Sequence, residues 1–199
     1  MSAPCDPVAH IDIRVSPPES VDNATMVNDA RVAEYRSVVA AVTGWAEPRA
    51  DIIAIGIVGS WARGEHHDGS DVDVVVLTPH KAAYAAGDDW IAAALGQVVP
   101  IVRRAEWGVL TERRVRLPSG LEIEFGLVEP SWAQTDPIDP GTAAVVADGG
   151  LLPAHDPHGL LTQLAAATSS TRPNRSEHAS ETADHIVPEE PVTCRRRGV

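Results

Sequence analysis

The chain has 199 residues, a length that allows one domain of ordinary size together with terminal segments. Its 16 Lys and Arg residues against 28 Asp and Glu residues give a formal net charge of -12, which argues against a protein that binds nucleic acid through many phosphate contacts. No apolar run approaches the roughly 20 residues that span a bilayer, so we expect a soluble protein, with no membrane partner, that binds a small molecule or another protein.

The two ends of the chain differ in composition from its middle. Residues 1–24 have a mixed, proline-containing composition that predicts a flexible arm. Three alternating branched residues within it would suit an added edge strand: Ile11, Ile13 and Val15. Residues 169–199 are rich in Ser, Thr, Pro and charge, and have too little apolar surface to offset the entropy of ordering, which predicts a disordered tail. Residues 25–168 remain as a single domain.

The cysteines and the N-terminus indicate the compartment. Cys5 and Cys194 both lie in the terminal segments, so a disulfide framework is not indicated. The first residues show no basic segment followed by an apolar one, as a secretory leader would. We therefore expect a cytoplasmic protein.

The first half of the domain alternates helix and strand. Residues 29–42 have apolar side chains at helical spacing, with Asn28 or Asp29 as a possible cap. The apolar run at 52–58 and the valine-rich run at 72–77 predict two buried strands. The alanine-rich segment 81–95 predicts one further helix.

Three extended segments are expected next. They cover residues 98–102, 109–117 and 121–128. The last two are separated only by Pro-Ser-Gly at 118–120, which predicts a hairpin.

The end of the domain is expected to add a small hairpin and a helix. Residues 143–146 and 151–152 flank a Gly-rich turn, and a short helix follows over 158–167. Together these elements predict an α/β (α+β) domain with a mixed central sheet flanked by helices.

The most informative stretch joins the two buried strands. The first ends in Gly59-Ser60, and after ten residues Asp71-Val72-Asp73 opens the second. Because side chains alternate along a strand, Asp71 and Asp73 face the same side and repel each other unless they share a cation. Hard oxygen ligands suit Mg²⁺, with nucleotide phosphates completing its coordination. Gly59 and Ser60 lie where a strand turns into a helix, so their N–H groups and the Ser60 hydroxyl can hold phosphate oxygens.

A third carboxylate is needed if two Mg²⁺ ions are to activate an attacking hydroxyl and stabilise a leaving pyrophosphate. Segment 121–128 offers Glu122 and Glu124 on one face of an apolar strand. If this strand pairs beside the one at 72–77, one glutamate reaches the aspartates and accepts the proton of an acceptor hydroxyl. We favour Glu124, which lies between two apolar residues, and keep Glu122, nearer the turn, as the alternative.

Gly-Ser, a spacer, Asp-x-Asp and a later acid between apolar residues resemble the pattern of the DNA polymerase beta-like nucleotidyltransferase superfamily. The spacing from Gly59-Ser60 to Asp71 and Asp73 is especially similar to that of minimal and aminoglycoside-type nucleotidyltransferase domains. The resemblance covers residues 52–128 and implies a single-domain nucleotidyltransferase fold. It also implies a Mg²⁺-dependent transferase that moves a nucleoside monophosphate from an NTP to a hydroxyl, with AMP and ATP as the expected group and donor.

The resemblance assigns roles to individual positions. It implies that the catalytic residues and metal ligands are Asp71, Asp73 and Glu124, and that the nucleotide-binding residues are Gly59, Ser60, Arg63 and Ser70. A solvated surface role for Arg63 is equally compatible with its position. Larger relatives add a C-terminal helical domain that builds the acceptor site, whereas here only a short segment follows the hairpin. The acceptor therefore stays open between a small-molecule hydroxyl, as in an aminoglycoside, and a protein side chain.

Charged residues on the hairpin have a structural interpretation that we prefer. Arg114 and Arg116 share a strand face and are expected to pair across the hairpin with Glu122 and Glu124. The alternative is that one of these arginines leans into the cleft and offsets charge on the pyrophosphate.

Two further groups are given their ordinary structural roles. The run His66-His67-Asp68 lacks further spaced ligands, so we expect it to face solvent rather than to bind a metal. Trp61 and Trp132 are expected to pack in or beside the core rather than to stack on a base.

The alternative to an enzyme is a binding protein with the same fold. Such a protein would sense nucleotides or act as an antitoxin by contact alone, and a broken set of acids would mark it. All three acids are present in the sequence, which favours the enzyme.

Overall fold

The structure is a computed structural model that describes residues 28–170. The expected N-terminal arm at residues 1–24, with its alternating branched residues, lies outside the described residues, as do Cys5 and Cys194. The expected tail at 169–199 also lies outside them, except for its first two residues, which end the last helix. Within residues 28–170, none of the helices combines the length and the hydropathy that crossing a membrane requires.

A mixed sheet of six strands in the order β3-β4-β5-β2-β1-β6 forms the centre of the domain. In chain order the strands are β1 (Ala54–Val58), β2 (Val72–Leu77), β3 (Ile101–Trp107), β4 (Leu110–Arg116), β5 (Glu122–Val128) and β6 (Leu151–His155). β2 and β5 run parallel, whereas the other neighbouring pairs are antiparallel. β2 and β5 therefore begin at the same end of the sheet at which their antiparallel neighbours β1 and β4 finish.

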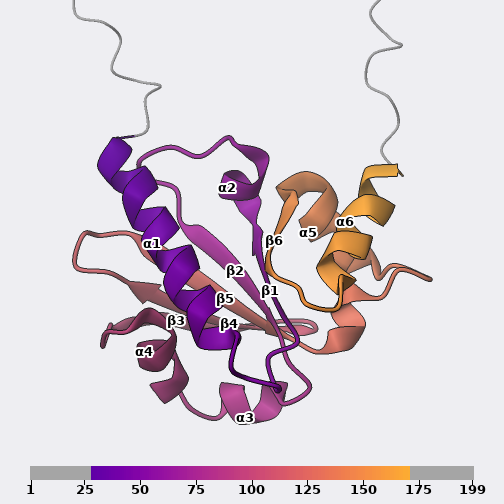
Figure 1. The fold of residues 1–199 in the computed structure, drawn as a ribbon, viewed down its shortest axis with the longest axis horizontal. Helices are drawn as coiled ribbons and strands as arrows, with labels where there is room; N and C mark the ends of the chain where they lie inside the picture. Colours follow the sequence, from indigo (N-terminus) through magenta and orange to yellow (C-terminus); the bar gives the residue numbers. More distant parts are fainter. Residues whose placement is uncertain (1–27, 171–199) are drawn as a thin grey trace, which may run out of the picture.

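Helices cover both faces of this sheet (Figure 1). One face packs against α1 (Asp29–Ala46), α3 (Lys81–Ala85) and α4 (Asp89–Leu95). The other packs against the 3-10 helix η1 (Pro130–Ala133), α5 (Pro140–Gly149) and α6 (Leu160–Ser170). The short helix α2 (Gly59–Arg63) directly follows β1. This is the predicted α+β architecture, in one domain.

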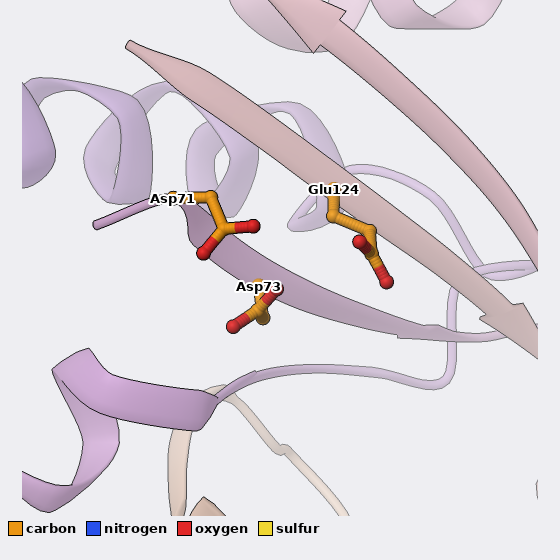
Figure 2. A group of neighbouring side chains, drawn as sticks. All are labelled: Asp71, Asp73 and Glu124. Atoms are coloured by element: carbon orange, nitrogen blue, oxygen red, sulfur yellow. The ribbon is translucent and has the colours of Figure 1, made fainter. Parts of the chain in front are cut away.

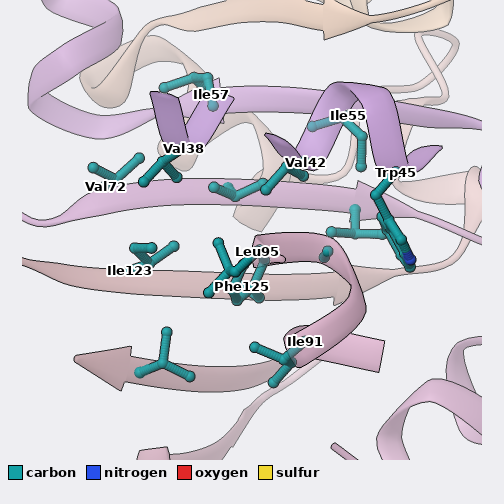
Figure 3. Packing of buried hydrophobic residues seen from close by; sticks show 14 of the residues in the cluster. Val38, Val42, Trp45, Ile55, Ile57, Val72, Ile91, Leu95, Ile123 and Phe125 are labelled. Carbon is teal, nitrogen blue, oxygen red and sulfur yellow. The ribbon is translucent and has the colours of Figure 1, made fainter. Parts of the chain in front are cut away.

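The alternation of side chains along β2 divides the core into two clusters. Val72, Val74 and Val76 belong to the cluster beneath α1 and α4, where Figure 3 shows side chains of α1 packed over the strands. Val75 and Leu77 belong to the cluster beneath α5 and α6. By the same alternation Asp73 projects toward the second face, which carries the charged residues described below.

The helix expected over residues 81–95 is wrong as a single element. It is two short helices, α3 and α4, separated by Ala86, Gly87 and Asp88. The indole N–H of Trp90 donates to the carbonyl oxygens of Tyr84 at 3.0 Å and Gly87 at 3.1 Å, so a side chain stabilises the break. Glycine also lacks the helix preference that would carry α3 through this point.

Two further element predictions need correction. The strand expected at 98–102 is β3, which begins and ends later, at Ile101–Trp107. The residues expected as a strand at 143–146 lie inside α5. Asp139 caps this helix by accepting a hydrogen bond from Thr142 N at 3.0 Å, and proline occupies its first position. A capping Asp followed by Pro was the overlooked helix-start signal.

We expect Leu164→Ala to lower the free energy of unfolding by about 2 to 5 kcal/mol, because Leu164 is fully buried between α6 and the sheet. Leu152→Ala is the matched control, since Leu152 is 46% exposed, and should cost less than about 1 kcal/mol. Urea denaturation of both variants measures the difference. Equal losses would contradict the packing of α6 described here.

Candidate active site

Three carboxylates converge where β2 and β5 begin. Asp71 immediately precedes β2, Asp73 lies within it, and Glu124 lies on β5. The parallel pairing puts Asp73 opposite Glu124, and Figure 2 shows the three side chains together at the neighbouring strands. One oxygen from each carboxylate lies within 4.8 Å of the others. The structure thus brings together the acids that the sequence singled out, with Glu124 rather than Glu122 in this group.

Asp73 is the carboxylate most affected by this crowding. The pKa of Asp73 is raised from 3.8 to about 7, chiefly by burial and further by the carboxylates of Asp71 and Glu124. The positive charges of Arg114 and Arg63 lower the same pKa and offset only part of it. The negative charge of the three carboxylates is therefore only partly offset by the neighbouring arginines.

The donor set fits a divalent cation. Three carboxylate oxygens converge from two adjacent strands, and oxygen donors of this kind suit Mg²⁺. Among residues 28–170, these three form the group of possible ligands with this geometry. The fit follows from the chemistry and spacing of the side chains and agrees with the Mg²⁺ expected from the sequence.

Gly59 makes room for Asp73 at this position. Its φ is 73°, a left-handed conformation that favours glycine. A Cβ atom built on Gly59 would collide with the carboxylate oxygen Oδ2 of Asp73. The glycine of the Gly-Ser pair therefore allows the end of β1 to lie against the carboxylate on β2.

The other expected nucleotide-binding residues lie on α2 and in the turn before Asp71. Ser60 and Arg63 lie on α2, and Arg63 Nε donates to Glu65 at 2.6 Å. Ser70 is buried, and its hydroxyl accepts a hydrogen bond from His67 N at 2.9 Å, which holds the turn that precedes Asp71.

A network of charged side chains continues from the triad across β4. Arg114 pairs with Glu124, and its Nη2 lies 3.3 Å from Asp71 Oδ2. Arg114 Nη1 lies 3.2 Å from Glu122 Oε2, and Arg116 donates to the same glutamate from Nη2 at 2.5 Å. The predicted pairing across the hairpin is confirmed. Arg114 also leans toward the aspartates.

Glu112 and Arg103 extend this network to β3. Glu112 is fully buried and accepts hydrogen bonds from Arg103 Nε at 2.5 Å and from Trp107 Nε1 at 2.6 Å. Burial opposes these bonds, yet they lower the pKa of Glu112. Arg103 was not among the candidates, because the strand was expected to end at Val102 and the register that sets Arg103 beside Arg114 depends on residues beyond that point.

The His-His-Asp run and Trp61 have local contacts that support the loop before β2. Trp61 is buried and stacks between two rings. Its ring centroid lies 4.0 Å from that of Tyr35 and 3.8 Å from that of His66. His67 Nδ1 accepts from Gly69 N at 3.1 Å, and Asp68 Oδ1 accepts from Asn28 N at 2.8 Å. The expected packing role of Trp61 is confirmed, and Trp132 is likewise buried in the second core cluster.

We expect Gly59→Ala to disrupt the triad, because the added methyl group must displace the carboxylate of Asp73. Gly64→Ala is the matched control. Gly64 has nearly the same φ, 72°, but no heavy atom within 4 Å of the added Cβ. Each variant should lose about 1 kcal/mol from the left-handed conformation. Only Gly59→Ala should also weaken Mn²⁺ binding, as measured by titration. Equal Mn²⁺ binding by the two variants would contradict the close approach.

We expect Asp73→Asn to stabilise the metal-free protein at neutral and alkaline pH. The folded-state pKa of Asp73 lies above its ordinary value, so its contribution to stability is present below about pH 4 and is lost as the pH rises through about 7. After allowance for solvent screening, the variant should gain about 1 to 2 kcal/mol at pH 8. Thermal denaturation in chelator at pH 8 and pH 4 measures this. A variant less stable than the wild type at pH 8, or a gain that is the same at both pH values, would contradict the origin assigned to the shift.

Comparison with known families agrees with this geometry. The nucleotidyltransferase domain family matches residues 44–116, which include Gly59, Asp71, Asp73 and Arg114 and end before β5. No curated protein matches the chain significantly.

Several solved structures are similar to the chain at low identity. Cid1 in complex with its short product ApU is 12% identical, covers 51% of this chain and 32% of its own, and has a TM-score of 0.39. A cytoplasmic RNA terminal U-transferase is 14% identical, with coverage of 61% and 34% and a TM-score of 0.41. A toxin-antitoxin with AMP-PNP is 14% identical, with coverage of 69% and 85% and a TM-score of 0.32.

The chain spans about a third of the length of the first two of these proteins. The likeness to known proteins therefore depends on the family match and on the motif that it contains. The matched segment holds the Gly-Ser pair at the end of β1 and both aspartates of β2, and the described fold adds the glutamate of β5 beside them. The segment of this chain that matches the nucleotidyltransferase domain family is thus residues 44–116.

Proposed function

We propose that this protein transfers a nucleoside monophosphate from an NTP to a hydroxyl group, with release of pyrophosphate. The observation that carries the proposal is the convergence of Asp71, Asp73 and Glu124 on paired strands, within 4.8 Å of one another. The family match supports the same class of reaction. Three crowded carboxylates cost stability, so an arrangement of this kind is best explained by a bound cation and its chemistry.

In this proposal Asp71, Asp73 and Glu124 hold Mg²⁺, with two ions expected in the presence of the NTP. The bound metal would neutralise the carboxylates and the phosphate charge that develops as pyrophosphate leaves. Gly59 and Ser60 contribute backbone N–H groups to the phosphates, beside Asp73.

Glu124 is the proposed base for the acceptor. As the hydroxyl oxygen bonds to the α-phosphorus, the bond from that phosphorus to the β-phosphate oxygen breaks, and the hydroxyl proton passes to the Glu124 carboxylate. Glu124 suits this role better than Glu122, because Glu124 is in register with Asp73. Both glutamates contact Arg114, but Glu122 also accepts a hydrogen bond from Arg116 at 2.5 Å, and this bond is the main cause that lowers the pKa of Glu122.

We propose that the acceptor enters through a cavity of about 530 Å³ beside Asp71. Charged side chains of both signs line it: Arg31, Asp68, Asp71, Arg114, Arg116 and Glu122. This volume suits a ligand of sugar or nucleoside size, or a single protein side chain that bears the hydroxyl. A lining of both signs would form ion pairs and hydrogen bonds with a polar acceptor, which supports a small hydroxylated molecule or a protein side chain alike.

The experiment uses α-labelled ATP, with the other three NTPs in parallel, Mg²⁺ and a cell lysate as the source of acceptor. We expect label on a small soluble product or on a protein band, and no label with Asp73→Asn. Label incorporation that is equal in the wild type and in folded Asp73→Asn would overturn the proposal. A nucleotide-dependent rise in melting temperature without any transfer would favour a binding protein with this fold instead.

A pair of glutamine variants tests the base. Glu124→Gln should lower kcat by about 10² to 10⁴, because it removes the proton acceptor, whereas Glu122→Gln should lower kcat far less. Steady-state kinetics with a fixed acceptor measures both, and circular dichroism checks that each variant is folded. A larger loss of kcat from Glu122→Gln would move the role of base to Glu122.

A further inference from the structure

Arg114 places its positive charge beside two of the three carboxylates of the triad. Its guanidinium pairs with Glu124, and its Nη2 lies 3.3 Å from Asp71 Oδ2. Both partners belong to the group of three carboxylates that fits a divalent cation. The arginine side chain is 21% exposed, so these contacts are partly shielded from water.

A guanidinium and a divalent cation satisfy the same carboxylate oxygens in the same way. Each offsets the repulsion between Asp71 and Glu124, and an oxygen engaged by one is less available to the other. We propose that Arg114, which contacts two of the three carboxylates where Arg103 lies 3.5 Å from one, is the main internal counter-ion of the triad, and that a divalent cation must displace it to bind. The inference rests on the proposed function only in that the triad must be a cation site.

The network offers Arg114 other partners when it withdraws. Its Nη1 already lies 3.2 Å from Glu122 Oε2, and its Nε lies 3.4 Å from Glu112 Oε1. Neither glutamate belongs to the triad. Displacement therefore gives up the pairs with Asp71 and Glu124 but keeps those with Glu122 and Glu112, and does not leave a partly buried guanidinium without a carboxylate.

This competition with the cation makes Arg114 a positioning residue that sets the cation affinity of the nucleotide-free protein. With Arg114 in place, the carboxylates are held together without a metal, at the cost of weaker metal binding. Without it, the triad would keep more of its repulsion in the metal-free state, with only Arg63 near Asp73 and Arg103 at 3.5 Å from Glu124 to offset it, and would gain more from each bound cation.

Mn²⁺ titration of chelator-stripped, nucleotide-free protein, followed by electron paramagnetic resonance, tests the inference. Arg114→Gln should tighten Mn²⁺ binding roughly tenfold, since it removes the competing charge. Arg114→Lys keeps that charge and should restore most of the weak wild-type affinity. Arg116→Gln is the matched control, because Arg116 pairs with Glu122 and lies outside the triad, and should leave Mn²⁺ affinity nearly unchanged.

If Arg114 only held the site together, Arg114→Gln would weaken Mn²⁺ binding, because a loosened site binds metal less tightly. Circular dichroism and the melting temperature in chelator confirm that each variant is folded, with Arg114→Gln expected to melt below the wild type. Unchanged or weaker Mn²⁺ binding by folded Arg114→Gln would overturn the inference, as would equal tightening by Arg116→Gln. Failure of every variant and of the wild type to bind Mn²⁺ would overturn the cation site itself.

Discussion

The parallel pairing of β2 with β5 sets Asp73 opposite Glu124, with Asp71 two residues earlier, and the rest of the site depends on how this negative charge is offset. The cost is visible at Asp73, where burial and its two acidic neighbours raise the pKa to about 7. Strand ends that served only for packing would not bring three carboxylates together. The arrangement is therefore best understood as one that trades stability for the ability to bind a cation.

The fold supports this arrangement by giving the two faces of the sheet different tasks. Beneath α1 and α4, the strands contribute a continuous apolar cluster that includes the fully buried Phe125. On the opposite face, the apolar cluster under α5 and α6 draws on β1, β2, β6 and the end of β5. The start of β5 and its neighbour β4 present charged side chains on that face instead. Rigid strands thus hold the acids, while the arginines of β4 lie close enough to exchange partners.

Much of this could be predicted from sequence where a pattern is local. The valine run of β2 and the period of two along it put both aspartates on one face, and the same period put Glu124 among the candidates. The choice between Glu122 and Glu124 depends on the register of two strands far apart in the chain, which local pattern does not encode. For the same reason the place of Arg103 beside Arg114 could not be predicted, because it is set by the register of β3 and β4. The strand expected at 143–146 failed for another reason, because a short apolar run cannot distinguish strand from helix without its capping residues.

We have proposed that Asp71, Asp73 and Glu124 form a divalent-cation site that serves a bound nucleotide. The most direct measurement is the anomalous difference map of a crystal grown with Mn²⁺ and a non-hydrolysable NTP analogue. We expect a Mn²⁺ peak at coordination distance, about 2.1 Å, from oxygens of the three carboxylates, with a phosphate oxygen in the same shell and the guanidinium of Arg114 turned toward Glu122. A map with the analogue bound but no Mn²⁺ at these carboxylates, and with Arg114 still paired to Glu124, would contradict it.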